Sequence, residues 1–153
     1  MLAKTPNLSL HVSYSPIAFF AFIIVGFAAG IFLEVPILSV SEEVLSYSGV
    51  AIIGAGSILI FSAQKAVRRI RSKKDGLINF HDGPYAHMRH PTYVGLLLLG
   101  LGLSLMLNSA VALLSVVFQY ITTSFIVTSE EKLLAEHHGE TFREYQKKVP
   151  RIF

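Results

Sequence analysis

The chain contains no cysteine among its 153 residues. A disulfide framework, a thiolate metal site and a cysteine nucleophile are therefore all excluded. Charged residues are also scarce, since they make up 15% of the chain while hydrophobic residues make up 52%, a balance far from that of a soluble domain. No nucleophilic triad and no phosphate-binding loop can be recognised.

Four long apolar stretches occupy most of the chain. They cover approximately residues 17–38, 45–63, 92–107 and 110–127. Each is near the ~20 residues that cross a bilayer core, and four such stretches leave too little polar surface for a soluble fold. The last two are joined through Asn108-Ser109, which predicts a helical hairpin with a tight turn. We therefore predict one all-α domain, a polytopic membrane bundle of about four transmembrane helices with a short C-terminal cytoplasmic helix.

Lysine and arginine are concentrated between the second and third stretches and after the fourth. They stand at Lys65, Arg68, Arg69, Arg71, Lys73, Lys74, Arg89, Lys132, Arg143, Lys147, Lys148 and Arg151. The positive-inside rule then places both termini and segments 64–91 and 128–153 in the cytoplasm. The basic run beside the second stretch is expected to bind anionic lipid headgroups rather than nucleic acid. The first stretch is too long and poorly bounded for a cleaved signal peptide, so we expect a retained span.

Two histidines, an arginine and a tyrosine surround a proline in the string AHMRHPTYVG, residues 86–95. Pro91 suits the first turn of a helix, and His90 before it is pushed into an extended conformation. Tyr85 and His90 are therefore predicted to lie on a non-helical strap, with Tyr93 on the first helical turn beneath it. The N–H groups of that turn favour an anionic ligand group. The alternative is an interfacial belt that only anchors the helix.

A second polar segment follows the fourth stretch. Glu130 and Glu131 stand at its cytoplasmic end, where acidic residues usually face a bundle interior or a polar cavity. Alternatively, they form a solvated helix end paired with Lys132 or nearby arginines. Gly139 is predicted to end this helix, and a capping box from Thr141 to start a short last one. Because the hairpin brings the two cytoplasmic segments side by side, the topology predicts a composite site at the membrane surface.

These strings together resemble the isoprenylcysteine carboxyl methyltransferase family, membrane-embedded enzymes that use S-adenosylmethionine and are related to phospholipid methyltransferases. The resemblance covers roughly the C-terminal half of the chain, with GPYAHMRHPTYVG before the hairpin and EEKLLAEHHGETFREYQKKVPR after it. The matching positions are Gly83, Pro84, Tyr85, Arg89, His90, Pro91, Tyr93, Gly95, Glu130, Glu131, Gly139, Tyr145, Val149 and Pro150. It implies O-methylation of an isoprenylcysteine-type carboxylate, with S-adenosylmethionine as the cofactor.

The resemblance also implies roles for individual residues. The expected cofactor-binding set is Tyr85, His87, His90, Pro91, Tyr93, Gly95, Glu130 and Glu131. The expected catalytic set is Arg89, Glu130, Glu131 and Arg151. Aromatic faces and a carboxylate suit the sulfonium cation of the cofactor, and an arginine would orient an acceptor carboxylate. An amine or thiol acceptor would instead need a proton acceptor, for which His87 and the two glutamates are the candidates.

Several alternatives stay open at this stage. The acceptor can be a phospholipid amine or a small thiol in place of a prenylated carboxylate, and membrane lipids are expected partners in each case. A different class is a non-catalytic bundle or a small transporter. Transport predicts ionisable residues at mid-membrane depth, but the only acidic candidate within a span, Glu34, lies near one end. No metal site is expected, because His81, His87 and His90 lack a diagnostic ligand spacing. The oligomeric state is left open.

Overall fold

The computed structural model describes residues 15–33, 35–72 and 82–152. Lys73, Lys74 and His81, which entered the predictions above, lie outside these ranges, as does Glu34. The described residues form α1 (Ser15–Leu33), α2 (Glu42–Ser72), the short 3-10 helix η1 (Gly83–Ala86), α3 (Pro91–Met106) and α4 (Ala110–Lys148). No strand occurs within them, so the all-α prediction is confirmed for this part of the chain.

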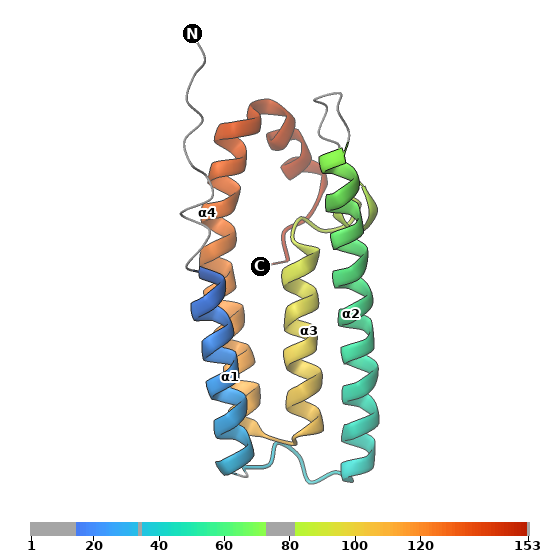
Figure 1. Cartoon of the computed structure of the whole chain (residues 1–153), viewed down its shortest axis with the longest axis vertical. Coiled ribbons are helices and arrows are strands. Elements are labelled where there is room, and N and C mark those ends of the chain that lie inside the picture. Colours follow the sequence, from blue (N-terminus) through green and yellow to red (C-terminus); the bar gives the residue numbers. More distant parts are fainter. Residues whose placement is uncertain (1–14, 34, 73–81, 153) are drawn as a thin grey trace.

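The helices stand side by side along one long axis (Figure 1). Helix α3 packs against both α2 and α4, and α1 packs against α4. The end of α2, the start of α3 and the last turns of α4 therefore meet at one end of the bundle, which is uppermost in Figure 1. The α3–α4 turn and the connection between α1 and α2 lie at the opposite end. The predicted meeting of the two polar segments is thus present in the fold.

Two helices are long and apolar enough to cross a membrane: α2 over Glu42–Arg69 and α4 over Ala110–Lys148. Ile24–Leu33 of α1 and Pro91–Met106 of α3 are also apolar but shorter than the ~20 residues of a full span. The described residues therefore contain two candidate membrane-spanning helices. The count of four spans stays a prediction.

Two helices continue beyond the apolar stretches that they contain. The apolar stretches end near residues 63 and 127, whereas α2 continues to Ser72 and α4 continues past Glu130 and Glu131 to Gly139, as predicted, and then on to Lys148. Polar side chains do not stop a helix that is already formed, whereas a proline in its interior does. The first stretch was predicted to reach residue 38, yet α1 ends at Leu33, before Pro36. The predicted break at Gly139 is confirmed, since its φ of 56° and ψ of −129° bend α4 there.

The α3–α4 turn fastens the connection between α1 and α2. Asn108 has a φ of 42°, and its side-chain Oδ1 accepts hydrogen bonds from the backbone N–H groups of Ile37 (3.0 Å) and Leu38 (3.2 Å). The hydroxyl of Ser109 donates to the carbonyl of Gly30 at 3.1 Å. These bonds satisfy backbone groups that are not paired within a helix. Such groups need a partner in the protein wherever water is excluded.

Helices α2 and α3 approach closely through two pairs of facing glycines. A Cβ added at Gly56 would lie 2.8 Å from the carbonyl oxygen of Gly95, and one at Gly95 would lie 2.9 Å from that of Gly56. Gly49 and Gly102 face one another in the same reciprocal way, at 2.5 Å and 2.6 Å. Small residues are the usual means by which membrane helices bring their backbones together. This contact fixes where α3 begins relative to α2, and so where the strap lies.

Candidate functional site

The strap consists of residues 83–90, directly before α3. Its backbone path is set by Gly83, by Pro84 and by Pro91, which follows it. Gly83 has a φ of 57°, and Pro84 helps to form one 3-10 turn that the N–H of His87 closes on the Pro84 carbonyl at 3.1 Å. Tyr85 therefore lies in a short helix, and the prediction of a wholly non-helical strap is wrong at this residue. His90 caps α3 in a non-helical conformation, with a φ of −129° and a ψ of 60°. Its predicted position outside the helix is confirmed, but the extended conformation predicted for it is wrong, because a ψ of 60° lies outside the extended region.

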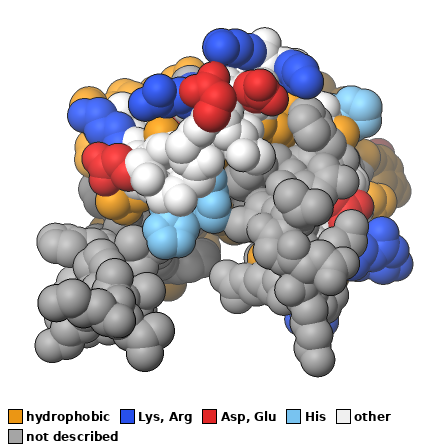
Figure 2. All heavy atoms as spheres, turned by 90° about the horizontal axis from the view of Figure 1, so that it is seen from above, with side chains coloured by type: hydrophobic (Ala, Val, Ile, Leu, Met, Phe, Trp, Pro, Cys, Tyr) orange, Lys and Arg blue, Asp and Glu red, His pale blue; other side chains and the backbone are white. Residues whose placement is uncertain are grey.

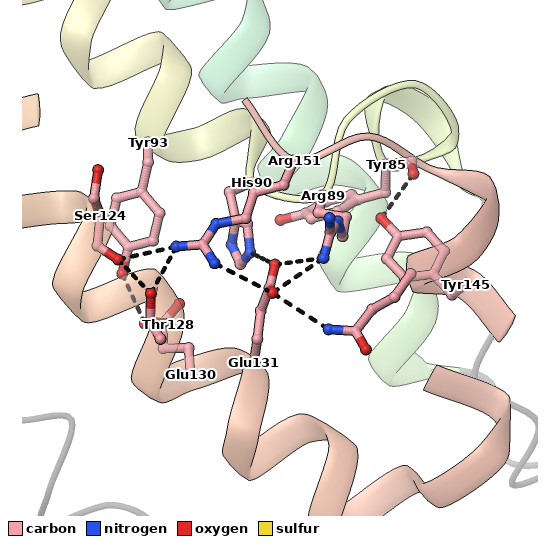
Figure 3. Close-up of polar contacts among 11 residues, drawn as sticks. Tyr85, Arg89, His90, Tyr93, Ser124, Thr128, Glu130, Glu131, Tyr145 and Arg151 are labelled. Carbon is pink, nitrogen blue, oxygen red and sulfur yellow. Dashed lines mark hydrogen bonds and ion pairs between the residues drawn. The ribbon is translucent and has the colours of Figure 1, made fainter. Parts of the chain in front are cut away.

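Glu131 on α4 is the centre of the site (Figure 3). Nη1 of Arg89 donates to both of its carboxylate oxygens at 3.0 Å, and Nε2 of His90 lies 3.0 Å from Oε1. Nε2 of Gln146 adds a longer hydrogen bond to Oε2 at 3.3 Å. Glu131 is 8% exposed, so this is a buried, shared carboxylate rather than a solvated helix end. Its acceptor positions are largely used by the protein itself.

The neighbouring Glu130 has a different environment. Its Oε1 accepts a hydrogen bond from the phenol of Tyr93 at 2.7 Å. Glu130 and Tyr93 thus form a pair that joins α4 to the first turn of α3 (Figure 3). Adjacent residues on a helix point in different directions, which explains why only Glu131 reaches Arg89 and His90.

The C-terminal residues fold back over the site after the bend at Gly139. Phe142, Tyr145 and Val149 are buried in one cluster, with Leu134 and Ala135 packed against it. The phenol of Tyr145 donates to the carbonyl of Tyr85 at 2.8 Å. These contacts hold the end of the chain against the strap.

Two backbone segments far apart in sequence also meet at this point. The N–H of Arg89 donates to the carbonyl of Pro150 at 3.4 Å, and this bond places Arg151 beside the cluster. Nη2 of Arg151 donates to the Ser124 carbonyl at 3.1 Å and to the Thr128 hydroxyl at 2.7 Å. Its Nη1 is 3.8 Å from Oε2 of Glu131. Arg151 therefore spans the space between the Glu131 cluster and the Glu130–Tyr93 pair (Figure 3).

Burial controls the protonation of the strap. It lowers the pKa of His90, and the hydrogen bond and charge of Glu131 oppose that shift only in part. His90 is therefore neutral at pH 7, and Nε2 carries the proton because the carboxylate can only accept. Burial also raises the pKa of Tyr85, so its phenol stays protonated. The positive charge of the cluster comes from arginine and not from histidine.

The structure brings together most of the residues expected from sequence, but not all. His87 is exposed, and Gly95 lies against Gly56 and Ile60 of α2. Pro91 is buried at the start of α3. The sequence did not predict that Gln146 and Thr128 contact the site. A single polar residue on a helix belongs to no recognisable motif, so its partner cannot be inferred from the sequence.

The polar groups of the site are chemically complementary to a zwitterionic ligand. Nε of Arg89 and Nε of Arg151 are buried with no hydrogen-bond partner among the described residues. Nε of Arg89 and the start of α3 suit the carboxylate of such a ligand, while Tyr93 and Glu130 suit its cation. No group of three histidine, aspartate or glutamate side chains in the described ranges could hold a metal ion.

Comparison with known proteins relates the site to enzymes. The sequence profile of the phospholipid methyltransferase family matches residues 44–141, which include the strap and both glutamates. The chain is also 34% identical over 99 residues to the protein-S-isoprenylcysteine O-methyltransferase of Schizosaccharomyces pombe. That match covers 61% of this chain and 41% of the yeast protein, so the chain spans less than half of that relative.

Proposed function

This chain belongs to the phospholipid methyltransferase family, and from that premise we propose that it is an integral-membrane methyltransferase using S-adenosylmethionine. Its proposed acceptor is lipophilic and carries an isoprenylcysteine-type carboxylate, the group named in the yeast relative. The observation that carries the proposal is the buried cluster of Arg89, His90 and Glu131 at one end of an apolar bundle. Buried ionisable groups in such a position are costly and typical of functional sites.

The cofactor contacts are proposed from the chemistry of the donors. Bound S-adenosylmethionine supplies an electrophilic methyl group on a sulfonium cation. The ring of Tyr93 and the carboxylate of Glu130 are suited to that positive charge, since Glu130 has Tyr93 as its only hydrogen-bond donor in the described chain. His90 and the N-terminus of α3 are suited to the polar end of the cofactor. Glu131 would act by holding Arg89 and His90 in place.

The residues proposed to bind the acceptor are chosen by the charge of the acceptor group. A carboxylate is already ionised at pH 7, so it needs a cation to orient it and no proton acceptor. Arg151 suits this role, because its closest contacts are to an uncharged carbonyl and hydroxyl, and because Glu131, 3.8 Å away, already bonds Arg89 at 3.0 Å. A phospholipid amine is the second candidate. It is favoured by the family profile and by Glu130, whose remaining acceptor capacity could take a proton.

We also propose that α1 to α4 all cross the membrane, with the site on the cytoplasmic face. Exposed basic side chains support this orientation, because Lys132, Arg143 and Lys147 lie at the same end as the site. Charged side chains gather there in the view from above (Figure 2). The other end has no lysine or arginine in residues 35–41 or 107–109. This distribution is the one that the positive-inside rule associates with cytoplasmic loops.

The orientation can be tested by labelling, because the chain has no cysteine of its own. Glu42→Cys and Lys147→Cys place single exposed thiols at opposite ends of the bundle. In intact cells, an impermeant maleimide is expected to label Glu42→Cys alone, and Lys147→Cys only after permeabilisation. The reverse pattern would overturn the orientation, and labelling of both in intact cells would overturn the span count.

Turnover with methyl-labelled cofactor tests the function. Purified protein is offered a farnesylated cysteine, phosphatidylethanolamine or a short water-soluble thiol. The expected result is methylation of the farnesylated cysteine as a base-labile ester, with little transfer to the other two. Base-stable label on phosphatidylethanolamine would support the amine candidate instead. Methylation of the soluble thiol alone would contradict a lipophilic acceptor.

A further inference from the structure

Arg151 is fastened to α4 by contacts that the proposed function leaves unexplained. We call the Thr128 hydroxyl and the Ser124 carbonyl the latch. Nη2 of Arg151 donates to these two groups at 2.7 Å and 3.1 Å, while its Nη1 stays 3.8 Å from Glu131. Arg89 lies much closer to Glu131, at 3.0 Å from both oxygens. The closest contacts of Arg151 are therefore with the latch.

The geometry of Thr128 makes it a directed acceptor. Its hydroxyl donates its one hydrogen to the Ser124 carbonyl at 2.8 Å, so towards Arg151 it can only accept. A guanidinium has five donors and no acceptor, which matches such a group. Arg151 follows the last helical turn on a non-helical segment, and its side chain is 26% exposed. Without the latch its long side chain would have several rotamers to choose from.

The two latch contacts do not themselves neutralise the charge of Arg151, whose ion pair with Glu131 is longer, at 3.8 Å. Neither a carbonyl nor a hydroxyl carries a formal charge, and Glu131 already accepts hydrogen bonds from Arg89, His90 and Gln146. Nε of Arg151 is buried and has no partner within the described part of the chain. A guanidinium held in this way has free capacity for a charge-assisted hydrogen bond to an anion.

We propose that Thr128 is a positioning residue: it fixes Arg151 to receive the anionic group of the acceptor and so sets the preference for carboxylate acceptors. This inference rests on the proposed function and adds a specificity determinant to it. Thr128 does not touch the acceptor in this account and acts only through Arg151. Removal of the Thr128 hydroxyl should therefore weaken the binding of an anionic acceptor more than the binding of a neutral one.

Three variants on α4 test the role of the hydroxyl. Thr128→Val removes it while keeping the shape of the side chain, and Thr128→Ser keeps it. Thr122→Val is the matched control. Among the described residues, the Thr122 hydroxyl bonds only the Phe118 carbonyl of its own helix, at 3.0 Å, and Arg151 makes no bond to it. Each protein is titrated calorimetrically, without cofactor, with farnesylated cysteine and with the corresponding neutral carboxamide. KM and kcat for the farnesylated cysteine are measured in parallel.

Loss of one charge-assisted hydrogen bond should weaken carboxylate binding roughly tenfold. In Thr128→Val we expect Kd and KM for the farnesylated cysteine to rise by that factor. The Kd of the carboxamide, the kcat and the melting temperature should stay unchanged. Thr128→Ser and Thr122→Val should behave like the wild type.

Several results would overturn the positioning role. An equal loss for acid and amide, or a lowered melting temperature, would give Thr128 a purely structural role. Unchanged binding of the acid in an active Thr128→Val enzyme would remove the inference while the proposed function stands. A wild-type protein that methylates no lipophilic acceptor would reject the proposed function and, with it, the inference.

Discussion

Replacement of Glu131 by alanine is expected to destabilise the protein by about 3 kcal/mol and to remove detectable binding of S-adenosylmethionine. The buried carboxylate accepts hydrogen bonds from Arg89, His90 and Gln146, so its loss leaves the arginine buried without its counter-ion. An unpaired buried charge costs more than the ion pair contributes, which is why the expected effect is large. Thermal unfolding in detergent measures the stability, and calorimetry with the cofactor measures the binding.

Two further variants separate charge from shape. Glu131→Gln keeps one acceptor oxygen and should lose less stability than Glu131→Ala, because Arg89 keeps a hydrogen-bond partner. Glu136→Ala is the control, since Glu136 is an exposed glutamate on the same helix. Glu136→Ala should change neither the free energy of unfolding nor the free energy of cofactor binding by more than about 0.5 kcal/mol. Wild-type affinity in both Glu131 variants would remove this residue from the site.

The meeting of the strap with the end of α4 could be predicted from the sequence. Two apolar stretches joined by two residues can only form an antiparallel hairpin, so residues before the first and after the second must emerge at the same end. The structure has this arrangement, with His90 and Glu131 in contact although they are 41 positions apart. Gly139 was also predictable, because a glycine after a long helix commonly adopts a positive φ.

The individual contacts could not be predicted in the same way. Arg89 was one of the expected catalytic residues, but its double hydrogen bond to Glu131 was not predicted. Which of two adjacent glutamates faces the strap depends on the rotation of α4 about its axis. That rotation is set by packing against α1 and α3, which a sequence pattern does not specify. The latch at Thr128 depends further on the path of the chain after Gly139.

Gly95 illustrates how one residue can satisfy both a motif and a packing requirement. The resemblance assigned it to cofactor binding, and the structure places it against the backbone of Gly56 on α2. A glycine in a helix loses about 1 kcal/mol relative to alanine, so its presence calls for a compensating contact. The close approach to Gly56 is such a contact, and it can be separated from any cofactor role because Gly56 lies outside the strap.

Substitution of Gly56 by valine is accordingly expected to destabilise the protein by about 3 kcal/mol, or roughly 10 °C in Tm. The new Cβ would meet the Gly95 carbonyl at 2.8 Å and the backbone N of Leu99 at 3.3 Å, and backbone atoms cannot turn aside as a side chain can. Helices α2 and α3 would have to separate, which also moves His90 relative to Glu131. Cofactor affinity should therefore fall together with stability.

Gly54→Val is the matched control for this change, two residues away on the same helix. A Cβ at Gly54 meets no atom of the described residues within 4 Å, so the same valine side chain should leave Tm and cofactor affinity near their wild-type values. Gly95→Val should reproduce the loss seen with Gly56→Val, because each glycine contacts the carbonyl of the other. If Gly95→Val abolished cofactor binding while Gly56→Val bound normally and kept its Tm, Gly95 would serve the cofactor and not the contact between the helices.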